Sequence, residues 1–488
     1  MSRRQELYDR LRAEGRQKVI LDEMIRHGFW EEGRPASTLT REERDRLFEV
    51  ARQVKQLSDL AEVLEDPEKA KAELRKRRMA EARAKRAETK RKREEARQAR
   101  ARAWAARKRN EILWVGPGVS RGLGQQKGEV PPELPDLQGA RRLAHAFDIS
   151  VGELRWLAYH RPVSATTHYR RFQLPKKTGG TRLISAPRPR LKRVQRWILD
   201  HILSVVPVHD AAHGFVAGRS IVTNAAAHVG RAVVLNLDLR NFFPTLSYPR
   251  VYGLFASLGY SREASTLLSL LCTEPEVDEV ELDGRTWYVH ASERHLPQGS
   301  PCSPALTNLI CRRLDRRLHG LAESLGFAYT RYADDLSFSH PSGDANVGRL
   351  LKAVRDIVAD EDFVVHPDKT RVMRRGRRQE VTGLIVNDRL GVPRDVLRQW
   401  RATLFQVRRD GPEGKRFGLG DDVLSALVGF AAFVRMVDEP RGDRMLTEAR
   451  EVARTHGWSP PRRPAPEAEA GPTEDAPVRW WEFWKWFR

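Results

Sequence analysis

The sequence is poor in cysteine and has no long apolar run. Three cysteines (Cys272, Cys302 and Cys311) occur in 488 residues, and their irregular spacing excludes a disulfide framework and a CxxC metal site. We therefore expect reduced thiols. No run of about 18 apolar residues is present, which argues against a membrane-spanning helix. Residues 1–15 lack the apolar segment of a secretory signal, so we expect a cytoplasmic protein.

Acidic residues are outnumbered by basic ones, at 65 Asp and Glu against 87 Lys and Arg, and the net charge is +22. Such a charge favours nucleic acid or an acidic membrane surface as a partner. Residues 69–109 hold 19 Lys and Arg and 5 Glu, a net charge of +14. This segment lacks Gly, Pro and an apolar stripe, which predicts one long helix outside any core. It is either a solvated arm that adds only solubility or an arm that contacts phosphates.

Composition divides the chain into segments with different expected roles. They are a small helical region (1–66), the basic helical arm (67–110), a Gly- and Pro-rich linker (111–137), a compact domain (138–458), a disordered linker (459–477) and an aromatic tail (478–488). In the first segment, Thr40 and Glu43 form a capping box. Apolar residues then recur at helical spacing: Leu47, Val50, Val54, Leu57, Leu60 and Leu64. The tail could stack on unpaired bases, insert at a membrane interface, bind a partner or pack on the protein itself.

One candidate catalytic residue lies in residues 232–246 (AVVLNLDLRNFFPTL). Leucines at 235, 237 and 239 alternate with polar residues, which predicts a strand with one apolar and one polar face. Asp238 is on the polar face, so we expect it to point away from the core. Taken alone, Asp238 is better explained as an ordinary half-exposed strand aspartate.

Two further acidic residues lie in residues 327–339 (FAYTRYADDLSFS). Asp334 and Asp335 separate two short β-prone runs, which is typical of a hairpin turn. Adjacent carboxylates among apolar neighbours are costly unless a cation is bound. Together with Asp238 they supply three oxygen-donor side chains, the kind that Mg²⁺ prefers. Two such ions would activate an attacking hydroxyl and stabilise a leaving phosphate oxygen, which predicts nucleotidyl transfer.

The order of several motifs resembles that of reverse transcriptases. Tyr332-Ala333-Asp334-Asp335 resembles the Y-x-D-D box of that family, and Asp238 matches the metal-binding aspartate of its first palm strand. Four further blocks follow the family's order: 169–187 resembles the fingers hairpin, 296–301 (LPQGSP) the loop beside the incoming nucleotide, 367–370 (PDKT) a motif with a lysine, and 381–384 (VTGL) the box near the primer grip. NAAAH at 224–228 resembles the NAxxH signature of bacterial retron reverse transcriptases, and the long basic N-terminus resembles their myxobacterial type.

The resemblance covers roughly residues 140–450. It implies an α+β right-hand polymerase with fingers and an antiparallel palm sheet (138–390), a helical thumb (391–458) and a helical basic N-terminal extension. The implied activity is RNA-directed DNA synthesis from deoxynucleoside triphosphates on a cognate noncoding RNA of the msr–msd type. An internal guanosine 2′-hydroxyl would prime it, and the product would be branched msDNA. The resemblance also implies an antiphage role, with an effector protein and a host ribonuclease H as partners.

The resemblance also implies roles for individual residues. Asp238, Asp334 and Asp335 would hold two Mg²⁺ ions, with Mn²⁺ as a substitute, and Lys369 would protonate the leaving pyrophosphate. Residues implied to bind the nucleotide are Lys177, Arg182, Phe243 and Gln298. Residues implied to bind RNA or primer are Asn224, His228, Val381, Thr382 and Gly383.

Simpler interpretations stay open for several of these residues. Lys177 and Lys369 are explained equally well as surface cations. The alternative for Gln298 is a residue that only forms the turn. Asn224 and His228 are explained equally well as a structural pair on one helix face. Phe243 would act as a gate against the ribose 2′-hydroxyl, with Phe242 in the core. At the level of the whole protein, the alternatives are a group II intron-like reverse transcriptase and a non-catalytic RNA-binding protein with a polymerase-like palm. The complete set of three aspartates argues against the latter.

Overall fold

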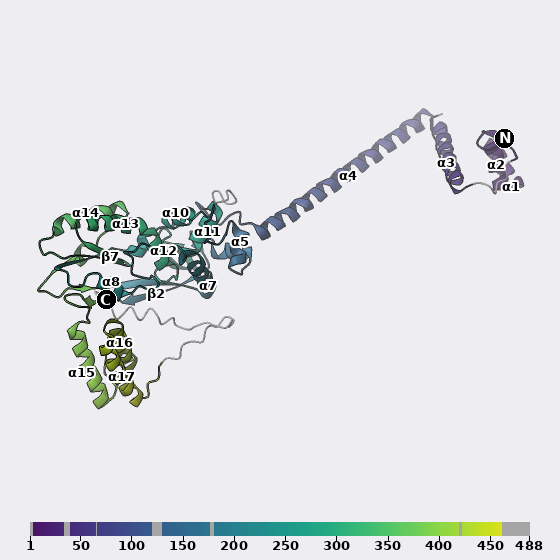
Figure 1. The fold of residues 1–488 in the computed structure, drawn as a ribbon. Coiled ribbons are helices and arrows are strands. Elements are labelled where there is room, and N and C mark those ends of the chain that lie inside the picture. The colour runs from purple at the N-terminus through teal and green to yellow at the C-terminus, as the bar shows by residue number, and fades with distance from the viewer. Residues whose placement is uncertain are drawn as a thin grey trace. The chain divides into compact units, whose positions relative to one another are not determined.

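The computed structural model describes residues 3–33, 40–64, 66–119, 129–175, 180–418 and 422–460 (Figure 1). The chain divides into two compact units, Met1–Trp104 and Ala105–Arg488. Lys177, the segment 461–477 and the aromatic tail at 478–488 lie outside the described residues. Within the described ranges, no helix is both long enough and apolar enough to cross a membrane.

The first unit is helical, with α1 (Arg3–Glu14), α2 (Arg16–Arg26), α3 (Arg41–Leu64) and most of α4 (Pro67–Asn110). The expected capping box starts α3: the backbone N–H of Thr40 donates to Glu43 Oε2 (2.9 Å), and that of Glu43 donates to Thr40 Oγ1 (3.3 Å). The apolar residues predicted on α3 are on the helix, but Val54 and Leu57 are exposed. Among the α3 side chains that the structure describes, none is buried, so they contribute no core to this unit.

The basic arm is a single helix, because the sequence over α4 contains no Gly and has Pro only at its first position. It has 44 residues and is therefore about 66 Å long. No residue of α4 is buried. The helix thus holds its charges in water along its whole length.

The second unit begins with a segment that differs from the expected linker at 111–137. Ile112, Val115, Leu134 and Leu137 are buried in the main hydrophobic core. The backbone N–H of His160 also donates to the carbonyl of Val115 (2.6 Å). The linker prediction is wrong for these described parts, because Gly and Pro suppress regular structure without preventing four apolar side chains from packing.

The next elements along the chain include a β-hairpin. They are α5 (Ala140–Ala146), α6 (Val151–Leu157), β1 (Val163–Ser164), β2 (Tyr169–Pro175), β3 (Thr181–Pro187), α7 (Pro189–Ile198) and the π-helix η2 (Leu199–Leu203). Strands β2 and β3 pair antiparallel over their full length, from Tyr169 opposite Pro187 to Pro175 opposite Thr181. The hairpin corresponds to the block that resembles the fingers. Helix α7 follows it directly and buries Leu191, Val194 and Ile198 on one face.

The central sheet has four antiparallel strands in the order β7-β8-β4-β9. The strands are β4 (Val233–Asp238), β7 (Ala328–Tyr332), β8 (Asp335–His340) and β9 (Arg371–Arg374). The connecting elements are α8 (Ile221–Ala226), α9 (Phe242–Thr245), α10 (Tyr248–Ser257), α11 (Arg262–Cys272), β5 (Val277–Leu282), β6 (Arg285–His290), α12 (Ser303–Ile310), α13 (Arg312–Ser324), α14 (Val347–Asp360) and the 3₁₀ turn η3 (Pro367–Lys369). Strand β6 pairs with both β1 and β5 in a separate three-stranded sheet of the order β1-β6-β5.

The two faces of the central sheet pack against different cores. Leu235 and Leu237 of β4 belong to the main core, which also contains buried residues of α13 and α14. Val234, on the other face, packs in a second core with Val381 and Leu384. The prediction of a polar, half-exposed face for this strand is therefore wrong in part. Asp238 is only 7% exposed, because β4 is a central strand covered on both sides.

The second core joins the sheet to a group of three helices, which Figure 1 shows on the side of the sheet opposite α13 and α14. The elements are β10 (Glu380–Val381), β11 (Leu384–Ile385), α15 (Arg394–Asp410), α16 (Val423–Val437) and α17 (Glu439–Thr455). Asp422 and Asp438 cap α16 and α17 through their side chains. At Gly442 a Cβ would overlap the backbone of Arg435, so the α16–α17 contact requires glycine at that position.

Candidate functional site

The three candidate aspartates come together at one end of the central sheet. Asp238, the last residue of β4, lies directly opposite Asp335, the first residue of β8. Residues directly opposite each other on antiparallel strands point to the same face, so these two carboxylates are neighbours. The backbone N–H of Leu239 also donates to the carbonyl of Asp334 (2.9 Å). Asp238 is buried, whereas Asp334 and Asp335 are half-buried.

The turn that carries Asp334 connects β7 to β8, with Tyr332 opposite Asp335. Ala333 has a φ of +56°, which is unusual for a residue with a side chain. Gly214 packs on the same turn, where a Cβ would lie 2.7 Å from the Ala333 backbone nitrogen. The turn is thus held in a strained conformation by its surroundings rather than by a glycine of its own.

A buried ion pair supports this turn from beneath. Arg331 and Asp315 are both completely buried, and the guanidinium donates to the two carboxylate oxygens through Nε and Nη2, each at 2.7 Å. Its Nη1 donates to Asn308 Oδ1 (3.0 Å) and to the carbonyl of Ala333 (3.2 Å). Burial alone would lower the pKa of Arg331, but Asp315 reverses this and keeps the pKa above its ordinary value. The Arg331 side chain therefore stays charged and fixes the residue before Asp334.

Sequence reasoning did not identify this ion pair. Its only signal is a charged arginine inside the β-prone run AYTRY, which carries no other charged residue. A buried charge must find a partner, but the partner, Asp315, is 16 residues away on α13. Only the packing of α13 on β7 shows that these two residues meet.

Lys369 lies at Asp238. Its Nζ donates to both carboxylate oxygens of Asp238, each at 2.9 Å, and the backbone N–H of His366 donates to the Asp238 carbonyl (2.7 Å). The η3 turn is thereby fixed beside the end of β4. A buried carboxylate is costly without a cation, and here the lysine ammonium neutralises it.

The donor set at this end of the sheet suits a hard divalent cation. Carboxylate oxygens are the ligands that Mg²⁺ prefers, and the pairing of Lys369 with both oxygens of Asp238 shows that a cation fits at this carboxylate. In the part of the chain that the structure describes, however, no three His, Cys, Asp or Glu side chains are gathered into a ready-made metal site.

Two of the residues predicted to bind the nucleotide, Arg182 and Gln298, lie on elements that contact each other. The backbone N–H of Ser185, on β3, donates to the carbonyl of Gln298 (2.7 Å), and a Cβ at Gly299 would lie 2.8 Å from the Ser185 carbonyl oxygen. Gln298 is half-buried, whereas Arg182 on β3 is exposed. The backbone N–H of Leu296 donates to the Leu246 carbonyl (3.0 Å), which ties this loop to the end of α9.

The two consecutive phenylalanines of helix α9 differ in burial. Phe242 is 3% exposed and its ring lies 5.5 Å from that of Phe363, so the prediction of a core residue is confirmed. Phe243 is half-buried. Asn241, in the left-handed region (φ +49°), turns the chain between β4 and α9.

The two blocks typical of retrons contact each other. Thr382 and Gly383 both have positive φ (+47° and +82°), so they form the tight turn of the β10–β11 hairpin. Asn224 Nδ2 donates to Thr382 Oγ1 (3.4 Å), and Thr382 Oγ1 donates to the carbonyl of Ile221 (3.4 Å). The hairpin is thereby fixed on α8.

Direct RNA contact is not compatible with the position of several of these residues. Asn224, His228 and Val381 are completely buried, so that prediction is wrong for their side chains in this structure. The two ring nitrogens of His228 pair with Ser339 Oγ and Thr330 Oγ1, each at 2.7 Å. Burial, with Arg231 and His213 nearby, lowers the pKa of His228 to about 3. His228 is thus a neutral residue that connects the α8 region to β7 and β8, the structural alternative.

Comparisons with known proteins agree with the motifs. Residues 174–388 match the family Reverse transcriptase (RNA-dependent DNA polymerase). The Retron Mx162 reverse transcriptase of Myxococcus xanthus is 45% identical over 342 residues, which cover 67% of this chain and 70% of the relative. The Retron Ec86 reverse transcriptase of Escherichia coli is 32% identical over 334 residues, which cover 67% and 93%. A telomerase structure from Candida tropicalis matches with 12% identity over 60% of this chain and 55% of that one, but its TM-score of 0.37 is too low to add support.

The chain belongs to the family of retron reverse transcriptases. Its activity is RNA-directed DNA polymerisation, for which this family uses an RNA template and a divalent metal. The sequence alone left two alternatives open, a group II intron-like enzyme and a non-catalytic RNA-binding protein. Because the chain belongs to the retron reverse transcriptases, neither alternative is retained.

Proposed function

We propose that this enzyme copies part of a cognate structured noncoding RNA into branched msDNA by two-metal nucleotidyl transfer, primed from an internal guanosine 2′-hydroxyl. The pairing of Asp238 with Asp335 across β4 and β8 carries the proposal, because it joins carboxylates from two elements distant in sequence. An antiphage role with an effector protein, and trimming by a host ribonuclease H, are the setting proposed for this activity.

The right-hand architecture is also part of the proposal. The β2–β3 hairpin and its surroundings would be the fingers, the β7-β8-β4-β9 sheet the palm, and α15, α16 and α17 the thumb. Helices α1 to α4 would form the N-terminal extension. The antiparallel sheet that carries all three aspartates supports this assignment.

The catalytic roles follow from position and charge. Asp238, Asp334 and Asp335 would hold two Mg²⁺ ions, which when bound would activate the attacking hydroxyl and offset the charge on the leaving phosphate. Lys369 Nζ lies 2.9 Å from each carboxylate oxygen of Asp238, at the proposed metal site, and we assign to it protonation of the leaving pyrophosphate. Arg182 and Lys177 would bind the triphosphate, and Gln298 would contact the sugar and base.

Phe243 would select deoxynucleotides by closing the space that a ribose 2′-hydroxyl needs. The Phe243→Ala enzyme is therefore expected to incorporate ribonucleotides at least about tenfold better relative to deoxynucleotides, since the gain is access for one hydroxyl group. Primer extension with each nucleotide type measures the ratio. Phe242→Ala is the matched control and should lower thermal stability without changing the ratio. Unchanged discrimination by Phe243→Ala would remove the assignment.

The test of the function as a whole is to identify the nucleic acid that the enzyme makes. The chain is expressed with its flanking native DNA, purified, and its nucleic acid is sequenced before and after treatment with a debranching enzyme. We expect DNA joined to RNA through a 2′ linkage, and RNA alone from the Asp334→Asn/Asp335→Asn enzyme. DNA with an ordinary free 5′ end would contradict the priming proposal while leaving the polymerase activity in place.

A further inference from the structure

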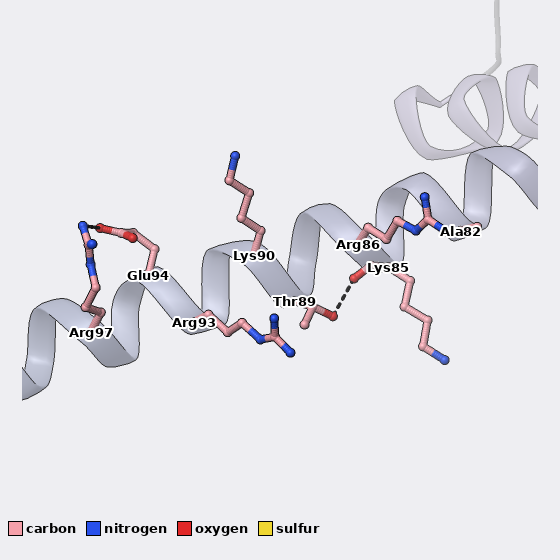
Figure 2. Close-up of a pocket in the computed structure, with 8 residues that line it drawn as sticks. All are labelled: Ala82, Lys85, Arg86, Thr89, Lys90, Arg93, Glu94 and Arg97. Atoms are coloured by element: carbon pink, nitrogen blue, oxygen red, sulfur yellow. Dashed lines mark hydrogen bonds and ion pairs between the residues drawn. The ribbon is translucent and has the colours of Figure 1, made fainter.

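One face of α4 carries a continuous line of positive charge. Six Lys and Arg side chains follow one another at alternating intervals of three and four residues: Arg83, Arg86, Lys90, Arg93, Arg97 and Arg100. This spacing places all six on one face of a helix, and we call them the basic stripe. The stripe is about 26 Å long, with about 4.5–6 Å between successive cations. Figure 2 shows Arg86, Lys90, Arg93 and Arg97 around one surface pocket.

The acidic residues of α4 neutralise a different part of the helix. Glu73, Glu81, Glu88 and Glu95 recur at intervals of seven or eight residues, which places them on the face opposite the stripe. Three of these four glutamates pair with cations outside the stripe: Glu73 with Arg77 (3.5 Å), Glu88 with Lys92 (2.7 Å) and Glu95 with Arg91 (3.5 Å).

Within the stripe, Arg97 pairs with Glu94 (3.0 Å). The other five stripe cations have no ion pair with any residue that the structure describes. The helix therefore separates its charges into a largely neutralised face and a face of available cations.

The stripe is incompatible with a coiled coil between two copies of α4. Alternating intervals of three and four are the contact positions of a coiled coil, which must be apolar, and here they are cationic. Two copies of α4 would repel each other along this line. The stripe instead fits a partner with closely spaced negative charge along a rigid axis. A nucleic acid duplex carries two phosphate charges per base pair, which in double-stranded DNA is one per about 1.7 Å of axis, so a duplex meets this requirement.

We propose that the basic stripe of α4 binds the phosphate backbone of a base-paired stem of the enzyme's RNA, without reading its sequence. Contacts from Lys and Arg to phosphates position a protein but carry no sequence information. No aromatic side chain lies between Arg83 and Arg100, and unpaired strands are bound mainly by stacking on aromatic rings. A straight helix matches a rigid duplex, and double-stranded RNA is recognised by its shape and phosphates. RNA is the expected duplex because the inference rests on the proposed function, in which the template is a structured RNA.

The test compares two variants of the full-length protein that lose the same charge from opposite faces of one helix. The stripe variant changes Arg83, Arg86, Lys90 and Arg93 to Gln. The control variant changes Arg77, Arg91, Lys92 and Arg102 to Gln. Glutamine keeps high helix propensity, and circular dichroism should show equal helix content in both proteins. Binding to a 20-base-pair RNA duplex of arbitrary sequence is measured by fluorescence anisotropy over a series of salt concentrations.

We expect the stripe variant to bind the duplex at least about tenfold more weakly at physiological salt. Its plot of log affinity against log salt should also be less steep by nearly one for each lost phosphate contact. The control variant should lose less than half as much in both quantities. A second duplex of unrelated sequence should give the same result. Equal losses in both variants, or no loss in the stripe variant, would overturn the proposal.

Other probes separate the stem from other anionic partners. Tighter binding of wild-type protein to single-stranded RNA or duplex DNA of the same sequence would contradict the proposal. The proposal would also be contradicted if the stripe variant lost binding to phosphatidylserine vesicles but bound RNA as tightly as the wild-type protein. Extension of a short preformed primer–template should be equal in wild-type and stripe-variant enzyme. If the polymerase proposal itself failed, wild-type enzyme would not extend that substrate at all, so the two failures are distinguishable.

Discussion

The enzyme with Asp334→Asn and Asp335→Asn is expected to lose DNA synthesis almost completely while it keeps its fold and its RNA affinity. Asparagine has the shape of aspartate but not the charge that holds a divalent cation. Loss of metal at this end of the sheet would remove both activation of the hydroxyl and stabilisation of the leaving phosphate. We expect kcat to fall by about 10³-fold or more, since several kcal/mol of transition-state stabilisation is lost. Primer extension and RNA binding by anisotropy measure the two properties in one preparation.

A matched control removes the same charge from the same part of the chain. Asp344 and Asp356 are exposed and lie between β8 and the end of α14. Changing both to asparagine should leave synthesis within about twofold of wild type, because solvent and salt screen exposed charges. Synthesis retained by the Asp334/Asp335 variant would mean that the pair opposite Asp238 is not the catalytic set, and the proposed mechanism would fall.

The Arg331→Lys enzyme is expected to lose about 10- to 100-fold in kcat, although Arg331 does not reach the substrate face. Lysine keeps the charge beside Asp315 but cannot donate at once to both carboxylate oxygens, to Asn308 and to the Ala333 carbonyl. The turn at Ala333, with its φ of +56°, would then be free to relax. A displacement of about 1 Å at reacting groups costs about 10²-fold, which sets the size of the expected effect. The KM for deoxynucleotides should change much less than kcat, because the residues proposed to contact the nucleotide lie on other elements.

Two further variants distinguish positioning from stability. Asp315→Ala leaves a completely buried guanidinium without its carboxylate, and it should lower the free energy of unfolding by about 3–5 kcal/mol. The double change Asp315→Leu/Arg331→Met replaces the ion pair by apolar groups of similar size and should recover much of that stability. It should not recover kcat, because the donor to the Ala333 carbonyl is still missing. Wild-type kcat in the double variant would show that the ion pair is structural only.

Several features of the site follow from short stretches of sequence. The Y-x-D-D turn and the strand that ends at Asp238 are local properties, set by alternation and by turn residues. The same is true of α4, whose length and solvent exposure follow from its composition. These features were predictable because each depends on residues within a few positions of one another.

Other features depend on which elements pack together. The NAxxH and VTG blocks suggest RNA contact as isolated motifs, yet they meet through Asn224 and Thr382, and His228 is buried between β7 and β8. The apolar residues of the 111–137 segment enter the core although their neighbours are typical of a linker. Burial of a side chain is a property of its three-dimensional neighbours, so a motif alone cannot separate a contact residue from a packing residue.

The sequence by itself determined the class of enzyme, the three acidic residues and the long basic helix, because each is encoded by residue type and spacing along one segment. Only the tertiary structure decided that Asp238 lies opposite Asp335, that Lys369 neutralises Asp238, and that Arg331 and Asp315 hold the turn before Asp334. These contacts join residues 16 to 131 positions apart. Strand order and helix packing bring them together, and both arise from burial of apolar surface over the whole domain rather than from any local pattern.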